Sequence, residues 1–142
     1  MSTEDEFLIH KLVARYADAV NRRDEKAWAA TWAEKAVWQL PTQPETRGRE
    51  SIVELWAGAM KTLPFVVQLV HHGVVDVNGD RATGTWYLNE HMKFREGAGV
   101  LNIGCYKDRY TKASGEWLFA ERRYTILYND ADASEEINLD TR

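Results

Sequence analysis

The sequence predicts an α+β fold in which three amino-terminal helices cover one face of a sheet formed by the rest of the chain. Apolar residues recur mainly at helical spacing before Pro64, and they alternate with polar residues in long runs after it. Asn78-Gly79 and two later glycine-containing turns separate those runs, which is typical of a meander of antiparallel strands. A strongly twisted sheet wrapped around helices leaves a conical cavity between the two layers, and we expect a pocket there.

Composition limits the class of protein. The chain has 142 residues, of which 44% are hydrophobic, and this is enough for a core of its own. We expect one domain over residues 1–128 and an acidic, flexible tail over 129–142. The net charge of −4, without a basic cluster, argues against nucleic-acid binding. The single cysteine, Cys105, the acidic amino terminus and the lack of a membrane-spanning apolar run indicate a soluble cytoplasmic protein.

The first helix is expected to begin at Thr3, where the T-x-x-E pattern forms a capping box, and to end near Asn21. Asp24 is a suitable N-cap for a second, short helix that carries Trp28 and Trp32. The apolar stripe of the first helix consists of Ile9, Leu12, Val13, Tyr16 and Val20.

A short strand over residues 36–40 and a proline-containing loop are expected next. A third helix follows Gly48 and stops before Pro64. The long strands are expected as a hairpin over 65–94, then over 100–111 and 116–128.

The hairpin contains most of the candidate acid–base residues. A two-residue type I′ turn is predicted at Asn78-Gly79. Because strand side chains alternate between faces, the buried face is expected to hold Phe65, Val67, Leu69, His71, Gly73, Val75 and Val77 with Ala82, Gly84, Trp86, Leu88, Glu90, Met92 and Phe94. The opposite face holds Gln68, His72, Asp76, Thr83, Thr85, Tyr87, Asn89, His91 and Lys93. His71 and Glu90 then enter an apolar layer, unless a bulge exchanges the faces beyond it.

Four segments in this order resemble a known superfamily. They are RYADAVNRRDEKAWAATWAEKAVW, GRESIVELW, VNGDRATG and GCYKDRYTKASGEWLFAERRY. The pattern resembles the nuclear transport factor 2-like superfamily, and within it the SnoaL-like (polyketide cyclase) and scytalone dehydratase-like branch. The resemblance covers about residues 5 to 128 and implies a cone-shaped barrel of curved sheet packed on the helices.

The chain is also similar to hexachlorocyclohexane dehydrochlorinase around AVNRRDEKAWAATW and VHHG. In that family a strand histidine and a helix-end aspartate form a base dyad. The resemblance assigns the histidine to His71 and the aspartate position to Asn21. The family's lysine and arginine correspond to Tyr16 and Arg122.

Similarity to scytalone dehydratase implies two pocket histidines, His71 and His91, and places Tyr106 at the position of a pocket asparagine. The helix-end aspartate again corresponds to Asn21. An asparagine carbonyl can fix the tautomer of a histidine, but it does not stabilise an imidazolium as an aspartate does.

The residues themselves leave each role open. His71 is either a general base or a buried neutral histidine bound to a protein acceptor. Glu90 either supplies the carboxylate that Asn21 lacks, or acts itself with a raised pKa, or is turned to solvent by a bulge, which the residues alone favour. The simple register opposes His91 in the pocket. Arg122 anchors either an anionic substrate group or a protein carboxylate. These five residues form the predicted catalytic set.

Aromatic and apolar residues are expected either to line the cavity or to fill the core. They are Tyr16, Trp38, Trp56, Met60, Trp86, Tyr106 and Tyr128. An aromatic lining suits a flat cyclic ligand. His71 and His72 are expected on opposite faces, where they cannot chelate one ion, and no metal or phosphate-binding motif occurs, so we expect no cofactor and no metal.

The leading hypothesis is a cofactor-independent lyase or isomerase, similar to a dehydratase, that acts on a small hydrophobic cyclic molecule with His71 as general base. The alternative is a non-catalytic protein that binds a small molecule or a partner. The resemblance also implies a homodimer formed through the outer face of the sheet.

Overall fold

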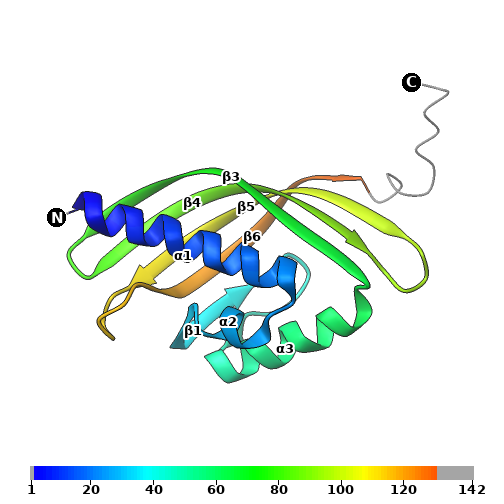
Figure 1. The fold of residues 1–142 in the computed structure, drawn as a ribbon, viewed down its shortest axis with the longest axis horizontal. Helices are drawn as coiled ribbons and strands as arrows, with labels where there is room; N and C mark the ends of the chain where they lie inside the picture. The colour runs from blue at the N-terminus through cyan, green and yellow to red at the C-terminus, as the bar shows by residue number, and fades with distance from the viewer. Residues whose placement is uncertain (1, 131–142) are drawn as a thin grey trace.

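The computed structural model describes residues 2–130 (Figure 1). The helices are α1 (Ser2–Arg22), α2 (Glu25–Ala29) and α3 (Arg49–Thr62). The strands are β1 (Trp32–Gln39), β2 (Thr46–Arg47), β3 (Phe65–Asn78), β4 (Arg81–Lys93), β5 (Gly99–Thr111) and β6 (Leu118–Asp130). None of the described helices is both long enough and apolar enough to cross a membrane.

The six strands form one sheet with the order β2-β1-β6-β5-β4-β3. All neighbours are antiparallel except β1 and β6, which are parallel. Figure 1 shows the long strands curving behind α1, with α2 and α3 near β1. The predicted α+β class is therefore confirmed, although the sheet stays open. We call the face toward the helices the inner face and the opposite one the outer face.

A tight connection joins α1 to α2. Arg23 takes a left-handed conformation with φ 59°. Its N–H donates to the carbonyl of Val20, and the N–H of Asp24 donates to the carbonyl of Ala19, as in a Schellman motif. The Asp24 carboxylate then accepts a hydrogen bond from the N–H of Ala27 at 3.0 Å. The predicted N-cap is confirmed, and it starts α2 immediately after α1 ends.

Several predicted boundaries differ from the structure. Trp32 begins β1 instead of continuing α2, because it pairs with Phe119 of β6. The proline-containing loop includes the short strand β2. Strand β6 extends to Asp130, so two residues of the predicted tail are strand; the rest of that tail, 131–142, lies outside the described residues.

The hairpin turns one residue later than predicted. Asn78 pairs with Arg81, so Gly79 and Asp80 are the turn residues, and Gly79 takes a positive φ of 63°. Each residue of β4 near the turn therefore pairs with the β3 residue two positions after the predicted one. Residues two apart on a strand share a face, so the shift leaves the faces near the turn unchanged. Gly73 and Trp86 accordingly lie on the inner face, as predicted, and they are register partners there.

A β-bulge at His71 and His72 exchanges the faces of the first half of β3. Register partners change there from Val70 with Leu88 to Gly73 with Trp86. As a result Val66, Gln68 and Val70 are on the inner face, whereas Phe65, Val67 and Leu69 are on the outer face. The predicted faces of this segment were wrong for that reason.

Three inner-face glycines provide room for aromatic rings. A Cβ at Gly73 would overlap Trp86, one at Gly84 would overlap Tyr110, and one at Gly104 would overlap Tyr124. The rings therefore lie across the backbone of neighbouring strands, where any larger residue would displace them.

An aromatic cluster fills the core between the helices and β1. Trp28 of α2 stacks on Trp56 of α3, with ring centroids 4.6 Å apart and planes 12° apart. Trp28 also contacts Trp32 and Trp38 edge-on. The Tyr16 ring of α1 packs against the same cluster. Burial of these large rings contributes much of the apolar stabilisation of the fold.

Replacing Gly104 by alanine is expected to lower the free energy of unfolding by about 1–3 kcal/mol, because the added Cβ meets the Tyr124 ring. The matched control is Gly58→Ala in α3, where no atom lies within 4 Å of the added Cβ. Alanine should stabilise that helix by about 0.5–1 kcal/mol. Urea denaturation measures both changes, and equal changes would contradict the packing role of Gly104.

Candidate active site

Four polar side chains form a row across the inner face of the sheet. Gln68, Glu90, Asn102 and Asn129 are successive register partners on β3, β4, β5 and β6. Gln68 Nε2 donates to Glu90 Oε2 at 2.7 Å, and Asn129 Nδ2 donates to Asn102 Oδ1 at 2.6 Å. We call these four residues the polar row. The adjacent rows are apolar and consist of Val66, Met92 and Val100 on one side and Val70, Leu88, Gly104 and Ile126 on the other.

Glu90 is the ionisable member of the polar row. Burial raises the pKa of its carboxyl, and interactions with Gln68, Asn102 and Tyr124 offset part of this rise. A carboxyl with a raised pKa can both accept and return a proton near neutral pH. The bulge turned His71 outward and left Glu90 inside, so the expectation that Glu90 faces solvent was wrong.

Two buried polar atoms beside Glu90 have no hydrogen-bond partner within residues 2–130. They are the hydroxyl of Tyr124 and Oε1 of Gln68. Burial, followed by the nearby charge of Glu90, raises the pKa of Tyr124, so this hydroxyl stays protonated and can donate. A buried polar group without a partner costs about 1–3 kcal/mol. A polar ligand bound next to Glu90 would supply the missing partners.

The tyrosines next to this site form a continuous aromatic wall. The Tyr106 and Tyr124 ring centroids are 4.7 Å apart, and the Tyr16 and Tyr106 hydroxyl oxygens are 3.3 Å apart. Burial raises the pKa of both Tyr16 and Tyr106. Of the predicted lining residues, Trp38, Trp56 and Trp86 are buried in the core with these tyrosines, and Met60 packs at its edge.

Arg122 lies deep in the core and is 1% exposed. Its Nε and Nη2 atoms donate to the two carboxylate oxygens of Asp108 at 2.8 and 3.2 Å. The guanidinium carbon lies 3.7 Å from the centre of the Tyr106 ring and 4.4 Å from that of Tyr16. Of the two roles predicted for Arg122, the structure therefore shows the one in which it binds a carboxylate of the protein.

The sequence reasoning missed Asp108. Its carboxylate also accepts a hydrogen bond from the Tyr110 hydroxyl at 2.6 Å, and that hydroxyl accepts one from Trp86 Nε1 at 2.7 Å. One signal was available. Tyr106, Asp108 and Tyr110 alternate along β5, so a buried arginine on the neighbouring strand had only this acid within reach.

Asn21 and His71 do not form a dyad. Asn21 Nδ2 donates to the carbonyl of Gln68 at 2.9 Å, and the N–H of Gln68 donates to Asn21 Oδ1 at 2.7 Å. His71 is exposed on the outer face, where its Nε2 lies 3.0 Å from Asn89 Oδ1. His72 is on the same face, with its ring 5.5 Å from that of Tyr87. The predicted inward position of His71, and the predicted opposite faces of the two histidines, were wrong because the bulge places both outside.

Two other predicted site residues lie away from the polar row. His91 is exposed on the outer face, between its partners Val67 and Leu101. Tyr128 is 53% exposed and pairs with Ile103 on the same face. In the described part of the chain, no three His, Cys, Asp or Glu side chains are arranged to hold a metal ion.

Comparison with known proteins identifies a family and several similar folds. A family model described as a SnoaL-like domain matches residues 1–123. A hexachlorocyclohexane dehydrochlorinase (LinA, type 3) from Novosphingobium barchaimii is 17% identical, with a TM-score of 0.84, over 91% of this chain and 90% of that chain. A putative scytalone dehydratase from Novosphingobium aromaticivorans is 15% identical, with a TM-score of 0.84, over 92% and 89%.

A protein of unknown function from Mycobacterium tuberculosis is similar over a larger part of this chain. It is 25% identical, with a TM-score of 0.79, over 97% of this chain and 80% of that chain. These structural similarities establish the nuclear transport factor 2-like fold.

Stability should depend on pH through Glu90. Because burial raises its pKa in the folded state, its stabilising effect is complete below the ordinary glutamate pKa of about 4.3 and is lost as pH rises through the raised value. Relative to Glu90→Gln, the wild type should therefore lose stability across that range in urea denaturation at a series of pH values. Glu96→Gln, at an exposed glutamate, is the control. A pH-independent difference between wild type and Glu90→Gln would contradict the burial effect.

Proposed function

Because this chain belongs to the family of SnoaL-like domains, we propose that it is a cofactor-independent lyase or isomerase that acts on a small hydrophobic cyclic molecule. The observation that carries this proposal is the buried Glu90 carboxyl in the polar row, beside the unpartnered Tyr124 hydroxyl. The names of two structural neighbours, a dehydrochlorinase and a putative dehydratase, describe eliminations. A cytoplasmic location suits the single cysteine, Cys105.

Glu90 replaces His71 as the proposed base. Its carboxylate accepts a proton from a substrate C–H bond, and the electron pair of that bond moves toward the neighbouring carbon. In a lyase this pair forms a C=C bond while a leaving group departs with its own bonding pair. In an isomerase a carbonyl oxygen holds the charge until Glu90 returns the proton to another carbon. A positioned base contributes about 10²–10⁴-fold to such a rate.

The neighbours of Glu90 have supporting roles in this proposal. Gln68 Nε2 holds one carboxylate oxygen, and this fixes the direction of the other. The Tyr124 hydroxyl, kept protonated by its raised pKa, donates to the leaving group or the carbonyl oxygen. Tyr16 and Tyr106 pack edge to face against each other in the wall next to this site.

The alternative function is small-molecule binding without catalysis. The observation that favours it is the position of Asn21, whose carboxamide bonds to the backbone N–H and carbonyl of Gln68 and not to a histidine. In that case Glu90 and Tyr124 would bind polar groups of a ligand that is released without reacting.

Activity should depend on Glu90 and not on His71. The assay measures chloride release from hexachlorocyclohexane, dehydration of scytalone, and deuterium uptake from solvent by cyclic ketones. Glu90→Gln should lower the rate about 10²–10⁴-fold, whereas His71→Ala should leave it within twofold. The wild-type rate should rise with pH as the Glu90 carboxylate forms. Loss of activity in His71→Ala alone would contradict the assignment of the base, and ligand binding without turnover would favour the alternative.

We also propose that the chain forms a homodimer through the outer face. The half of this face farther from the hairpin turn exposes an apolar side chain on each of four adjacent strands, namely Leu69, Tyr87, Ile103 and Tyr128. A contiguous exposed apolar patch is typical of an interface between protein subunits. The histidines His72 and His91 border this patch.

Ile103→Asp should convert a dimer into a monomer, because the substitution places a charge in the centre of the apolar patch. The matched control is Phe7→Asp on α1, which replaces a more exposed apolar residue outside the patch, 62% exposed against 37% for Ile103. Size-exclusion chromatography with light scattering gives the mass of each variant. A monomeric wild type would contradict the proposal.

A further inference from the structure

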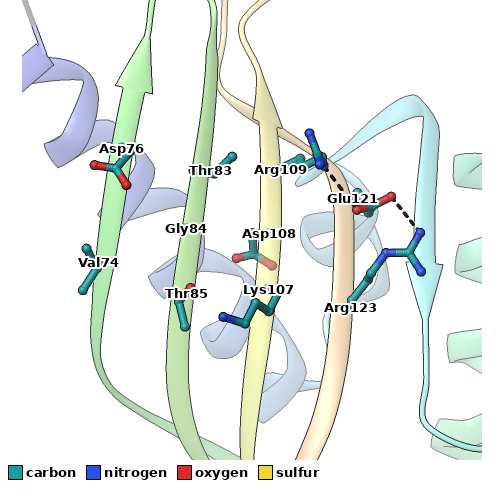
Figure 2. A pocket seen from close by; sticks show the side chains of 10 residues that line it. All are labelled: Val74, Asp76, Thr83, Gly84, Thr85, Lys107, Asp108, Arg109, Glu121 and Arg123. Atoms are coloured by element: carbon teal, nitrogen blue, oxygen red, sulfur yellow. Dashed lines mark hydrogen bonds and ion pairs between the residues drawn. The ribbon is translucent and has the colours of Figure 1, made fainter.

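The half of the outer face nearer the hairpin turn differs in character from the apolar half. It contains a hollow of 420 Å³, bordered by β3, β4, β5 and β6 (Figure 2). A second hollow, of 600 Å³, adjoins it toward the turn and extends to β1. Asp76, Thr83 and Arg109 line both hollows, so the two are adjacent. We call them together the outer groove.

The outer groove is positively charged on an acidic chain. Its cations are Lys35, Arg81, Lys107, Arg109 and Arg123. Its exposed or half-buried acids are Asp76 and Glu121, which leaves an excess of three positive charges, whereas the whole chain carries −4. Asp108 also borders the groove, but its carboxylate is buried and neutralised by Arg122.

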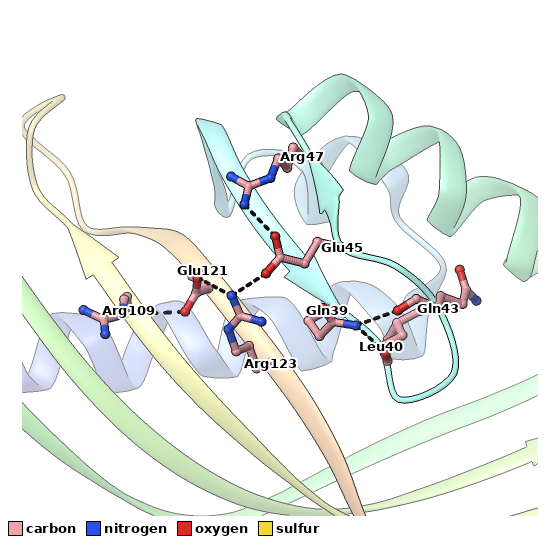
Figure 3. Close-up of polar contacts among 8 residues, drawn as sticks. All are labelled: Gln39, Leu40, Gln43, Glu45, Arg47, Arg109, Glu121 and Arg123. Carbon is pink, nitrogen blue, oxygen red and sulfur yellow. Dashed lines mark hydrogen bonds and ion pairs between the residues drawn. The ribbon is translucent and has the colours of Figure 1, made fainter.

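Glu121 of the outer groove and Glu45 of the adjacent loop both form ion pairs with Arg123, and Glu45 also pairs with Arg47 (Figure 3). Arg123 donates to Glu45 at 2.6 Å and to Glu121 at 3.0 Å. Arg109 has only a longer contact of 3.6 Å with Glu121, and its side chain is 71% exposed. The Arg109 guanidinium therefore retains donors that can bind a ligand.

Lys107 lies among other cations of the groove. It is the register partner of Arg123 on β6, and Arg109 follows two residues later on the same face of β5. No carboxylate forms an ion pair with Lys107 in the described part of the chain. Like charges opposite each other across strands destabilise a sheet. A bound anion would remove this repulsion.

The hydroxyl groups on the neighbouring strand complete a binding surface. Thr85 is the register partner of Lys107, and Thr83 is that of Arg109. Both line the hollow next to these cations (Figure 2). An arginine fork binds carboxylate or phosphate oxygens in pairs, a lysine adds a point charge, and hydroxyls donate single hydrogen bonds.

From this arrangement we propose that the outer groove binds a small polyanion, a molecule with two or more phosphate or carboxylate groups, through Lys107 and Arg109. Thr83 and Thr85 contribute hydroxyl donors. The site is on the face of the sheet opposite the polar row, so the proposal is independent of the role of Glu90.

Isothermal titration of the full chain at low ionic strength tests this proposal, with pyrophosphate and citrate as separate probes. Saturable binding of one ion per chain is expected. Lys107→Gln and Arg109→Gln should each weaken it at least tenfold. Lys93→Gln removes the same charge from the outer face at the far end of β4 and should change affinity less than twofold. Tighter binding of pyrophosphate would indicate a phosphate ligand, and tighter binding of citrate a carboxylate ligand.

Two results would overturn the proposal. One is the absence of saturable binding by both ions, and the other is an equal loss of binding in Lys93→Gln and Lys107→Gln, which would indicate a general charge effect. Unfolding does not account for a loss in Lys107→Gln, because removing a repelled charge should leave the melting temperature unchanged or raise it. Thermal denaturation without ligand checks this point.

Discussion

The bulge at His71 and His72 determines which chemistry the inner face of the sheet contains. Without it, Gln68 would face outward and His71 inward, and Glu90 would lack its hydrogen-bond donor. One extra residue in β3 therefore decides whether His71 or Gln68 faces the interior beside Glu90. The place of Gln68 in the polar row and the histidine-bordered outer face both follow from this single change of register.

The buried ion pair of Arg122 and Asp108 serves the fold and not the exchange of protons with a substrate. Both oxygens of Asp108 are used, and the guanidinium is enclosed by aromatic rings. A buried pair of this kind contributes little net stability, but removing either partner leaves an uncompensated charge in the core. The pair thus constrains how β5 and β6 align beneath Tyr106, which supports the wall next to Glu90.

Local sequence patterns predicted most of the fold, but less of the site. Helical stripes, the Asp24 cap and the glycine-containing turns act over a few residues, and each element formed where expected, apart from a shift of one residue in the hairpin turn. The face of His71 depended on a bulge that no turn residue and no change in periodicity predicts. Assigning faces by simple alternation therefore failed at this position. Simple alternation placed Glu90 inside but Gln68 outside, and the favoured alternative, in which a bulge turns Glu90 to solvent, was wrong. Asp108 required knowing which strand lies next to Arg122.

The Asn21 carboxamide has a further consequence for the solubility of the folded chain. Strand β3 is at the edge of the sheet, and the unpaired backbone groups of an edge strand can pair with a strand of another molecule. The side chain of Asn21 occupies both the N–H and the carbonyl of Gln68, as a neighbouring strand would. The end of α1 therefore closes part of an edge that would otherwise be open to edge-to-edge aggregation. A polar residue at a helix end thereby helps to keep an open sheet from growing.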